Sequence, residues 1–260
     1  GGVEAGAKNR KRDDLGEPWA QAAPLVRSFL RRAVRVNQMD FETALDEMAS
    51  LASGKPLRVY KQAFYRKHTK DRWSRDDPAF AVCQCGFLAI AAVATGLALR
   101  LRRVVTFVYL VFAGVVLHWL VGGLVASVAT AYVANRWLRH PDGQRVEWFY
   151  AFDVHCNAFF VSFLLSYVLH FFLLPVTLRH RSFAALLVAN SLHTAAFAAY
   201  FYVTHLGFRT LPSLTNTEVF LYPVLGAVCF LLLTLLLALL FGLRINLSTL
   251  ALTALLAPLP

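Results

Sequence analysis

Residues 104–133 read VVTFVYLVFAGVVLHWLVGGLVASVATAYV, with no Asp, Glu, Lys or Arg among them. A helix needs about 20 apolar residues to cross a bilayer core, because lipid offers unpaired backbone groups no hydrogen-bond partner. This stretch is therefore long enough to span a membrane. Outward from it, comparable apolar runs cover residues 79–99, 148–174, 183–208 and 219–241. The chain is expected to be an all-α polytopic membrane protein with five transmembrane helices.

The charged residues are concentrated ahead of the first span. Of the 26 basic and 15 acidic residues, 27 lie in the first 78 positions, and the net charge is +11. Such a charge suits an acidic partner, an anionic membrane face or RNA, but Lys and Arg also mark the cytoplasmic side of most membrane proteins. Near the span ends, more basic residues lie on the side of the membrane that carries the N-terminal head than on the opposite side. The N-terminus is therefore expected in the cytoplasm, and the tail 242–260 in the lumen.

The N-terminal head is expected to have two parts. Residues 1–36 are basic, and their polar start, rich in Gly and Ala, is typical of disorder, so this part is expected to be disordered. Residues 37–78 predict short amphipathic helices followed by an aromatic-basic segment. In the first of these helices, Leu45 and Met48 are expected on the apolar face and Glu47 on the polar face.

The aromatic-basic segment is RVYKQAFYRKHTKDRWSRDDPAF, residues 58–80. Aromatic residues beside basic ones mark membrane interfaces, and Arg and Trp are common energetic anchors of protein interfaces. Bases also stack on aromatic rings while phosphates pair with cations, which keeps RNA as an alternative partner. The candidate partner-binding residues are Arg66, Lys67, Lys70, Arg72, Trp73 and Arg75.

The third span carries the polar sequence YAFDVHCNAFF, residues 150–160. Asp153 and Asn157 lie one helical turn apart on one face, whereas His155 points elsewhere. Ionisable groups inside a membrane are costly and often functional, so a transporter or intramembrane enzyme built on Asp153 and His155 is one hypothesis. A structural hydrogen-bond network between helices is the favoured one, because Asp153 lies near the start of its span and no second carboxylate accompanies it.

Catalytic and cofactor motifs are missing from the sequence. It has no Walker loop, Gly-rich dinucleotide turn, G-x-S-x-G elbow or H-E-x-x-H motif. The chain is therefore not expected to be an enzyme, and neither a cofactor nor a metal is expected. Cys83, Cys85, Cys156 and Cys229 all lie in apolar runs and are expected to be free thiols.

Two longer stretches resemble a known family. The sequence QMDFETALDEM, residues 38–48, precedes the aromatic-basic segment, and VEWFYAFDVHCNAFF, residues 146–160, precedes LPSLTNTEVFLYP, residues 211–223. Together they resemble the uncoordinated-fifty (Unc-fifty) family of small five-span Golgi membrane proteins. The resemblance covers about residues 37–223, which is most of the chain.

The resemblance implies a role in vesicle traffic, with a cytoplasmic head and a lumenal C-terminus in the Golgi membrane. The family has been linked to large Arf guanine-nucleotide exchange factors and to the delivery of multi-subunit receptors. An exchange factor and receptor cargo are thus the implied partners, beside the lipid bilayer. RNA binding and an inner-nuclear-membrane location have also been attributed within the family. We expect the head to recruit or scaffold the exchange factor, with RNA binding or an activity of Asp153 and His155 as alternatives.

Overall fold

A computed structural model describes residues 18–179 and 182–256. Regular structure in this part of the chain is helical, apart from one isolated β-bridge between Arg139 and Leu214. Among the described residues, five helical segments are long and apolar enough to cross a membrane. They span Ala79–Ala98, Val104–Leu138, Trp148–Thr177, Phe183–Arg209 and Thr217–Phe241. The predicted fold class of an all-α polytopic protein with five spans is confirmed.

The second and third spans alternate between α-helical and wider π-helical turns. The second consists of α6 (Val104–Phe112), the π-helical η2 (Ala113–Val121), α7 (Gly122–Val133) and the π-helical η3 (Ala134–Leu138). The third consists of α8 (Trp148–Phe163), the π-helical η4 (Leu164–Leu169) and α9 (His170–Thr177). The other spans are α5 (Ala79–Ala98), α10 (Phe183–Arg209), and the 3-10 turn η5 (Thr217–Leu221) continuing into α11 (Tyr222–Phe241).

Two span boundaries differ from the prediction by three residues or more. The second span continues to Leu138 instead of ending at residue 133, because Ala134 and Leu138 are buried against neighbouring helices. The third span continues through Pro175 to Thr177 instead of ending at residue 174. A proline is tolerated inside a membrane helix when neighbouring turns compensate for the donor that it lacks.

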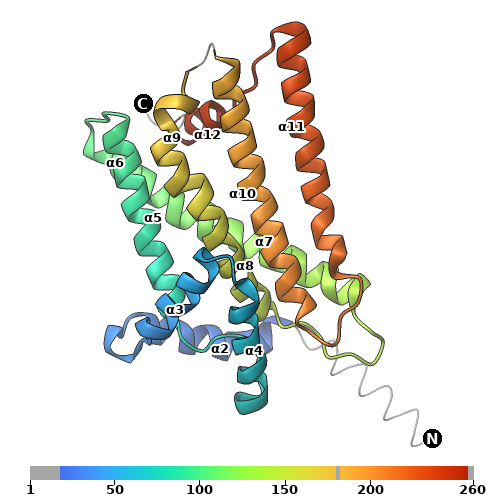
Figure 1. The fold of residues 1–260 in the computed structure, drawn as a ribbon. Coiled ribbons are helices and arrows are strands. Elements are labelled where there is room, and N and C mark those ends of the chain that lie inside the picture. The colour runs from blue at the N-terminus through green and yellow to red at the C-terminus, as the bar shows by residue number, and fades with distance from the viewer. Residues whose placement is uncertain (1–17, 180–181, 257–260) are drawn as a thin grey trace, which may run out of the picture.

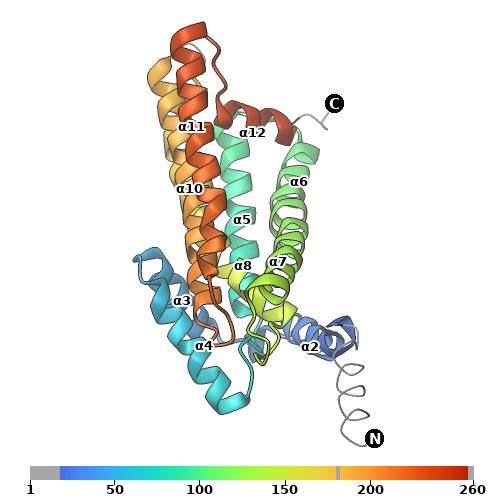
Figure 2. The same ribbon diagram turned by 90° about the vertical axis from the view of Figure 1, so that its right-hand side faces the viewer.

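The head lies at one end of the bundle (Figures 1 and 2). It consists of α2 (Pro18–Ala33), the 3-10 turn η1 (Val36–Gln38), α3 (Phe41–Ala52) and α4 (Pro56–Lys70). The amphipathic helices expected within 37–78 are α3 and α4.

The expectation of disorder over residues 1–36 is wrong for α2, while residues 1–17 lie outside the described residues. The contacts of α2 with the rest of the chain explain the difference. The ring of Phe29 packs edge-on against Phe149 with centroids 5.2 Å apart, and Arg32 donates a 3.3 Å hydrogen bond to the carbonyl of Asp76.

The buried face of α3 is rotated from the predicted one. Its buried residues include Ala44, Glu47, Met48 and Leu51, whereas Leu45 is 49% exposed. The helix packs with this face on α5 and α8, and that packing overrides the apolar pattern expected from the sequence. A carboxylate that was expected in water is thereby placed inside the protein.

A short apolar helix, α12 (Leu247–Leu256), crosses the far end of the bundle (Figure 2). The side chain of Asn190, which is fully buried in α10, ties it there. The Asn190 amide donates hydrogen bonds of 2.8 Å to the Ile245 carbonyl and 3.0 Å to the Thr234 hydroxyl, and its oxygen accepts one of 2.9 Å from the Leu247 N–H. The predicted tail 242–260 therefore contains a docked helix; residues 257–260 lie outside the described part.

The substitution Asn190→Leu is expected to release α12. It preserves the approximate volume of the side chain but leaves the Leu247 N–H and the Ile245 carbonyl without this partner, at about 1–3 kcal/mol for each buried group. Hydrogen–deuterium exchange of residues 243–256 should rise, while exchange in the head stays unchanged. Ala195→Leu, an exposed site on the same helix, should leave exchange in α12 as in the parent chain. Unchanged exchange in Asn190→Leu would contradict the role of this amide.

Candidate functional site

A non-helical strap, residues 71–78, connects the head to the first span. It begins at Asp71, whose left-handed backbone (φ 53°) ends α4. At the other end, the carboxylate of Asp77 accepts hydrogen bonds of 2.8 Å from the Ala79 N–H and 2.9 Å from the Asp40 N–H. Asp77 therefore fixes the starts of both α5 and α3. Between these two ends, the strap turns Trp73 and Arg75 into the protein.

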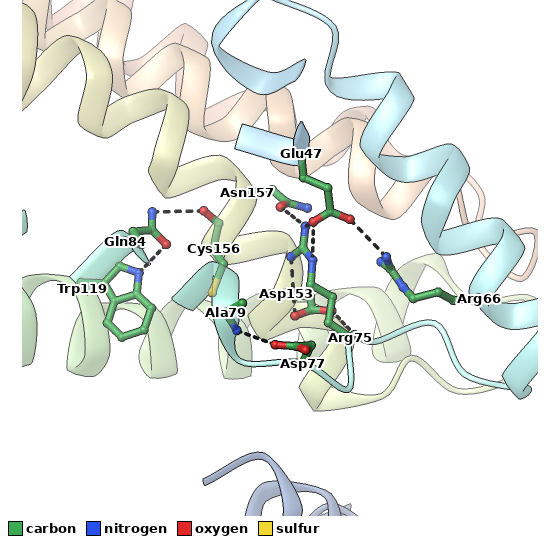
Figure 3. Close-up of polar contacts among 10 residues, drawn as sticks. All are labelled: Glu47, Arg66, Arg75, Asp77, Ala79, Gln84, Trp119, Asp153, Cys156 and Asn157. Carbon is green, nitrogen blue, oxygen red and sulfur yellow. Dashed lines mark hydrogen bonds and ion pairs between the residues drawn. The ribbon is translucent and has the colours of Figure 1, made fainter. Parts of the chain in front are cut away.

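The side chain of Arg75 is the centre of a buried polar cluster (Figure 3). Its Nε donates a 2.8 Å hydrogen bond to Glu47 Oε2 on α3, and a terminal nitrogen lies 2.6 Å from the same oxygen. That nitrogen also donates a 2.6 Å hydrogen bond to Asn157 Oδ1 on α8. One guanidinium thus joins the head to the third span.

Asp153 and Arg66 complete this arrangement, which we call the Arg75 cluster (Glu47, Arg66, Arg75, Asp153 and Asn157). The Arg75 backbone N–H donates to Asp153 Oδ2, and the guanidinium lies 3.7 Å from Asp153 Oδ1. Arg66 donates a 3.3 Å hydrogen bond to Glu47 Oε1. The Arg75 guanidinium carbon also lies 4.4 Å from the centre of the Phe80 ring.

The charges of the Arg75 cluster balance. It contains two guanidinium and two carboxylate groups, and Glu47, Arg75 and Asp153 are all buried. Burial opposes the charge on Arg75, but the Glu47 and Asp153 carboxylates outweigh burial and raise the pKa of Arg75 above its ordinary value. Burial, followed by repulsion from Arg75, lowers the pKa of Arg66. Buried ion pairs of this kind are sensitive to the loss of one partner, because the remaining charge is left without compensation.

Aromatic residues seal the cluster from the head side. Trp73 is 8% exposed, and its ring centroid lies 6.2 Å from that of Tyr150 on α8. The hydroxyls of Tyr60 and Tyr150 donate hydrogen bonds of 2.9 Å and 2.7 Å to the carbonyls of Val203 and Gly207 on α10. The head is therefore packed against both the third and the fourth span.

The six candidate partner-binding residues do not share one surface. The expectation that they form an exposed cluster is wrong for Trp73 and Arg75, which are buried because they anchor the strap to the spans. Arg66 and Lys67 are partly buried. Lys70 and Arg72 remain exposed, with side-chain exposures of 60% and 49%.

The polar residues of the third span behave as their spacing predicted. Asp153 and Asn157 both face Arg75, whereas His155 points away and its Nδ1 lies 2.8 Å from the Tyr200 hydroxyl on α10. Asp153 was expected without a second carboxylate, but Glu47 is brought to the same cluster by the head. The position of Glu47 between Ala44 and Met48 in the sequence was the one signal that could have indicated that this carboxylate is buried.

A second polar contact between helices was not predicted from the sequence. Gln84 on α5 is fully buried, accepts a 2.9 Å hydrogen bond from the Trp119 indole and donates a 3.3 Å one to the Cys156 carbonyl. The four cysteines are free thiols, as expected. Among the described residues, no three His, Cys, Asp or Glu side chains gather as metal ligands would.

These features define a class: a helical membrane protein with five spans, whose folded N-terminal head is held to the spans by buried ion pairs. The model of the UNC-50 family matches residues 29–253. The chain is 38% identical to "Protein unc-50 homolog" of Dictyostelium discoideum over 218 residues, covering 82% of this chain and 83% of that protein. It is 40% identical to "Protein unc-50 homolog" of Homo sapiens over 198 residues, covering 75% of each. No solved structure matches the chain.

The chain belongs to the UNC-50 family. The family resemblance expected from these stretches of the sequence is thereby confirmed.

Proposed function

We propose that this chain is a Golgi membrane protein of vesicle traffic, whose cytoplasmic head recruits a large Arf guanine-nucleotide exchange factor. In this proposal, the C-terminus faces the lumen and the recruited factor supports the transport of membrane cargo such as multi-subunit receptors. The observation that carries the proposal is that the head is a folded unit fixed to the spans, because a rigid platform presents a partner-binding surface without a large ordering cost.

The outer side of α4 and the strap supply such a surface. Tyr65 is 71% exposed and Phe64 46%, and the basic side chains of Lys70 and Arg72 lie on the same segment. Exposed aromatic rings beside basic groups are the residue types that anchor protein interfaces. These residues replace Trp73 and Arg75 as the candidate contacts.

The charge distribution favours a protein partner over RNA. Lys67 lies 2.7 Å from the carboxylate of Asp71, and Lys70 and Arg72 lie 3.2 Å and 3.6 Å from that of Asp76. Cations that are already paired in this way neutralise fewer phosphates, so this segment offers less free positive charge to a nucleic acid than its composition suggests. RNA binding would show affinity that falls steeply with salt, as counterion release requires.

The contacts of Asp153 favour a structural role over transport or catalysis. Both of its oxygens face Arg75, and His155 is directed toward a different helix. A proton relay or ion path needs neighbouring groups that exchange partners, whereas these two side chains have separate, fixed ones. We therefore infer that Asp153 holds the head in place.

The test is recruitment of the exchange factor in cells that lack this protein. Replacement with a Tyr65→Ala/Arg72→Glu variant should lower Golgi recruitment about fivefold or more, because interface anchors often contribute 1–2 kcal/mol or more each. Lys55→Glu, a charge reversal at the opposite end of α4, is the matched control and should recruit normally. The protein level and Golgi location of each variant are measured in parallel. A normally located double variant with full recruitment would contradict the proposal.

A further inference from the structure

A cavity of about 340 Å³ lies in the half of the bundle remote from the head. Its walls come from α5, α6, η2, η4, α9 and α10, and α12 covers it. Its volume falls in the range of about 300–1,000 Å³ that is common for small-molecule sites. Figure 2 shows α12 crossing from the side of α10 and α11 toward α6 at this end. The cavity is distinct from the Arg75 cluster, and none of the five cluster residues lines it.

Most of the lining is hydrocarbon, with a few polar groups. His118 from η2 is hydrogen-bonded through Nδ1 to the hydroxyl of Tyr167 from η4. The imidazole rings of His170 and His193 are in edge contact: their planes are nearly perpendicular, and their centroids lie 5.0 Å apart. An apolar cavity with a small number of convergent polar side chains is the usual composition of a ligand site.

The polar groups select a ligand that is neutral and donates a hydrogen bond. His193 Nδ1 lies 2.9 Å from the Ala189 carbonyl, so this nitrogen carries the hydrogen and the Nε2 of the neutral ring is an acceptor. None of the described lining residues is Asp, Glu, Lys or Arg. A charged ligand would therefore be buried without a counter-charge, which is costly, whereas a hydroxyl group would find an acceptor.

The backbone around the cavity provides an independent observation. Two of the three described π-helical segments, η2 and η4, contribute side chains to the lining, and wide turns of this kind occur frequently at functional sites. Gly114 on η2 lines the cavity, and a Cβ placed there would meet no atom within 4 Å. The cavity therefore extends to the helix backbone at this position.

We propose that this cavity binds a neutral lipid alcohol, a molecule with an apolar body and one hydroxyl group, which enters from the bilayer. Sterols and diacylglycerols share this chemistry. In this proposal the hydroxyl lies among the imidazoles and the Tyr167 hydroxyl, and the part of the apolar body inside the cavity lies along lining leucines such as Leu110, Leu174 and Leu252. This inference does not depend on recruitment of an exchange factor.

Photoaffinity labelling of the full chain in lipid nanodiscs tests the proposal. The probes are a photoactivatable sterol, a photoactivatable diacylglycerol, and a photoactivatable phosphatidic acid with the same acyl chains. Either alcohol should label peptides from η2, η4 or α12, and the two alcohol arms identify which source binds. Excess unlabelled alcohol should reduce this labelling, whereas its methyl ether should not. Equal labelling by phosphatidic acid, or equal competition by the ether, would overturn the proposal.

The substitution Gly114→Leu should lower labelling of these peptides about tenfold, equivalent to about 1.4 kcal/mol, because the added side chain occupies part of the cavity. Gly226→Leu on α11 is the matched control: Gly226 is exposed, and a Cβ added there would likewise meet no atom within 4 Å, but it lies outside the cavity. Labelling in this control should match the parent chain. If Gly114→Leu were labelled as strongly as the parent chain, the assignment of this cavity as the binding site would be refuted. If that variant folds poorly, the competition with the methyl ether tests the proposal independently.

Discussion

Arg75→Ala is expected to cost about 3–5 kcal/mol of stability, because it leaves the buried Glu47 and Asp153 carboxylates without their principal cation. The Arg75 guanidinium has contacts of 2.6 Å with both Glu47 and Asn157, whereas the contact of Arg66 with Glu47 is 3.3 Å. For a chain of this size, such a loss corresponds to a fall in Tm of about 10 °C. Heating the detergent-solubilised protein and measuring the remaining monodisperse fraction would detect it.

Two comparisons isolate the charge effect. Arg72→Ala, at a half-exposed neighbour in the same strap, should change Tm by no more than about 2 °C, as exposed pairs contribute little. Arg75→Met combined with Glu47→Gln and Asp153→Asn removes three of the four charges of the cluster, leaves that of the partly buried Arg66, and retains an acceptor for the Arg75 backbone N–H. This triple variant should recover at least half of the lost stability. If Arg75→Ala alone unfolded at the temperature of the parent chain, the cluster would not hold the head.

Gly123→Leu is the second substitution with a large expected effect, a loss of about 3 kcal/mol of stability. A Cβ at Gly123 would lie 2.4 Å from His155 Nε2 and 2.6 Å from its Cδ2. The imidazole is 4% exposed and fixed by the 2.8 Å contact with Tyr200, so it has little room to move. Overpacking costs about 1–3 kcal/mol, and displacing the ring adds a lost hydrogen bond of about 1 kcal/mol.

The preceding glycine provides the control. A Cβ at Gly122 would meet only the Leu117 carbonyl, at 3.7 Å, so Gly122→Leu should retain the parent Tm within about 2 °C. Gly123→Ala should fall between the two leucine variants. Equal melting of Gly122→Leu and Gly123→Leu would show that α7 does not approach His155 as closely as the structure indicates.

The membrane part of the fold could be predicted because span length is a requirement of the bilayer itself. An apolar run such as 104–133 has no other common explanation. The helix ends were less predictable: Leu138 stays helical through packing, and Pro175 lies inside α9. Neither effect is visible in the local sequence, since both depend on what the neighbouring spans supply.

The candidate site could be predicted only in part. The spacing of Asp153 and Asn157 placed them on one face, but nothing local linked them to Arg75, 78 positions earlier. The aromatic-basic segment suggested an exposed surface, but its composition does not distinguish residues that face water from residues that face a span. Burial of Trp73 and Arg75 follows from the strap, whose path is set by the left-handed Asp71 and by Asp77.

The separation of Arg75 from Asp153 along the chain has a consequence for biosynthesis. A ribosome makes the head and the first two spans before it makes the third, so the head leaves the ribosome before its partners on the third and fourth spans exist. Until Asp153 and Asn157 are inserted, the Arg75 guanidinium must remain hydrated or pair with the Glu47 carboxylate alone. Docking of the head is therefore a late event that reports insertion of the third span. A nascent chain that fails at this step would present an undocked head to the quality-control machinery of the cell.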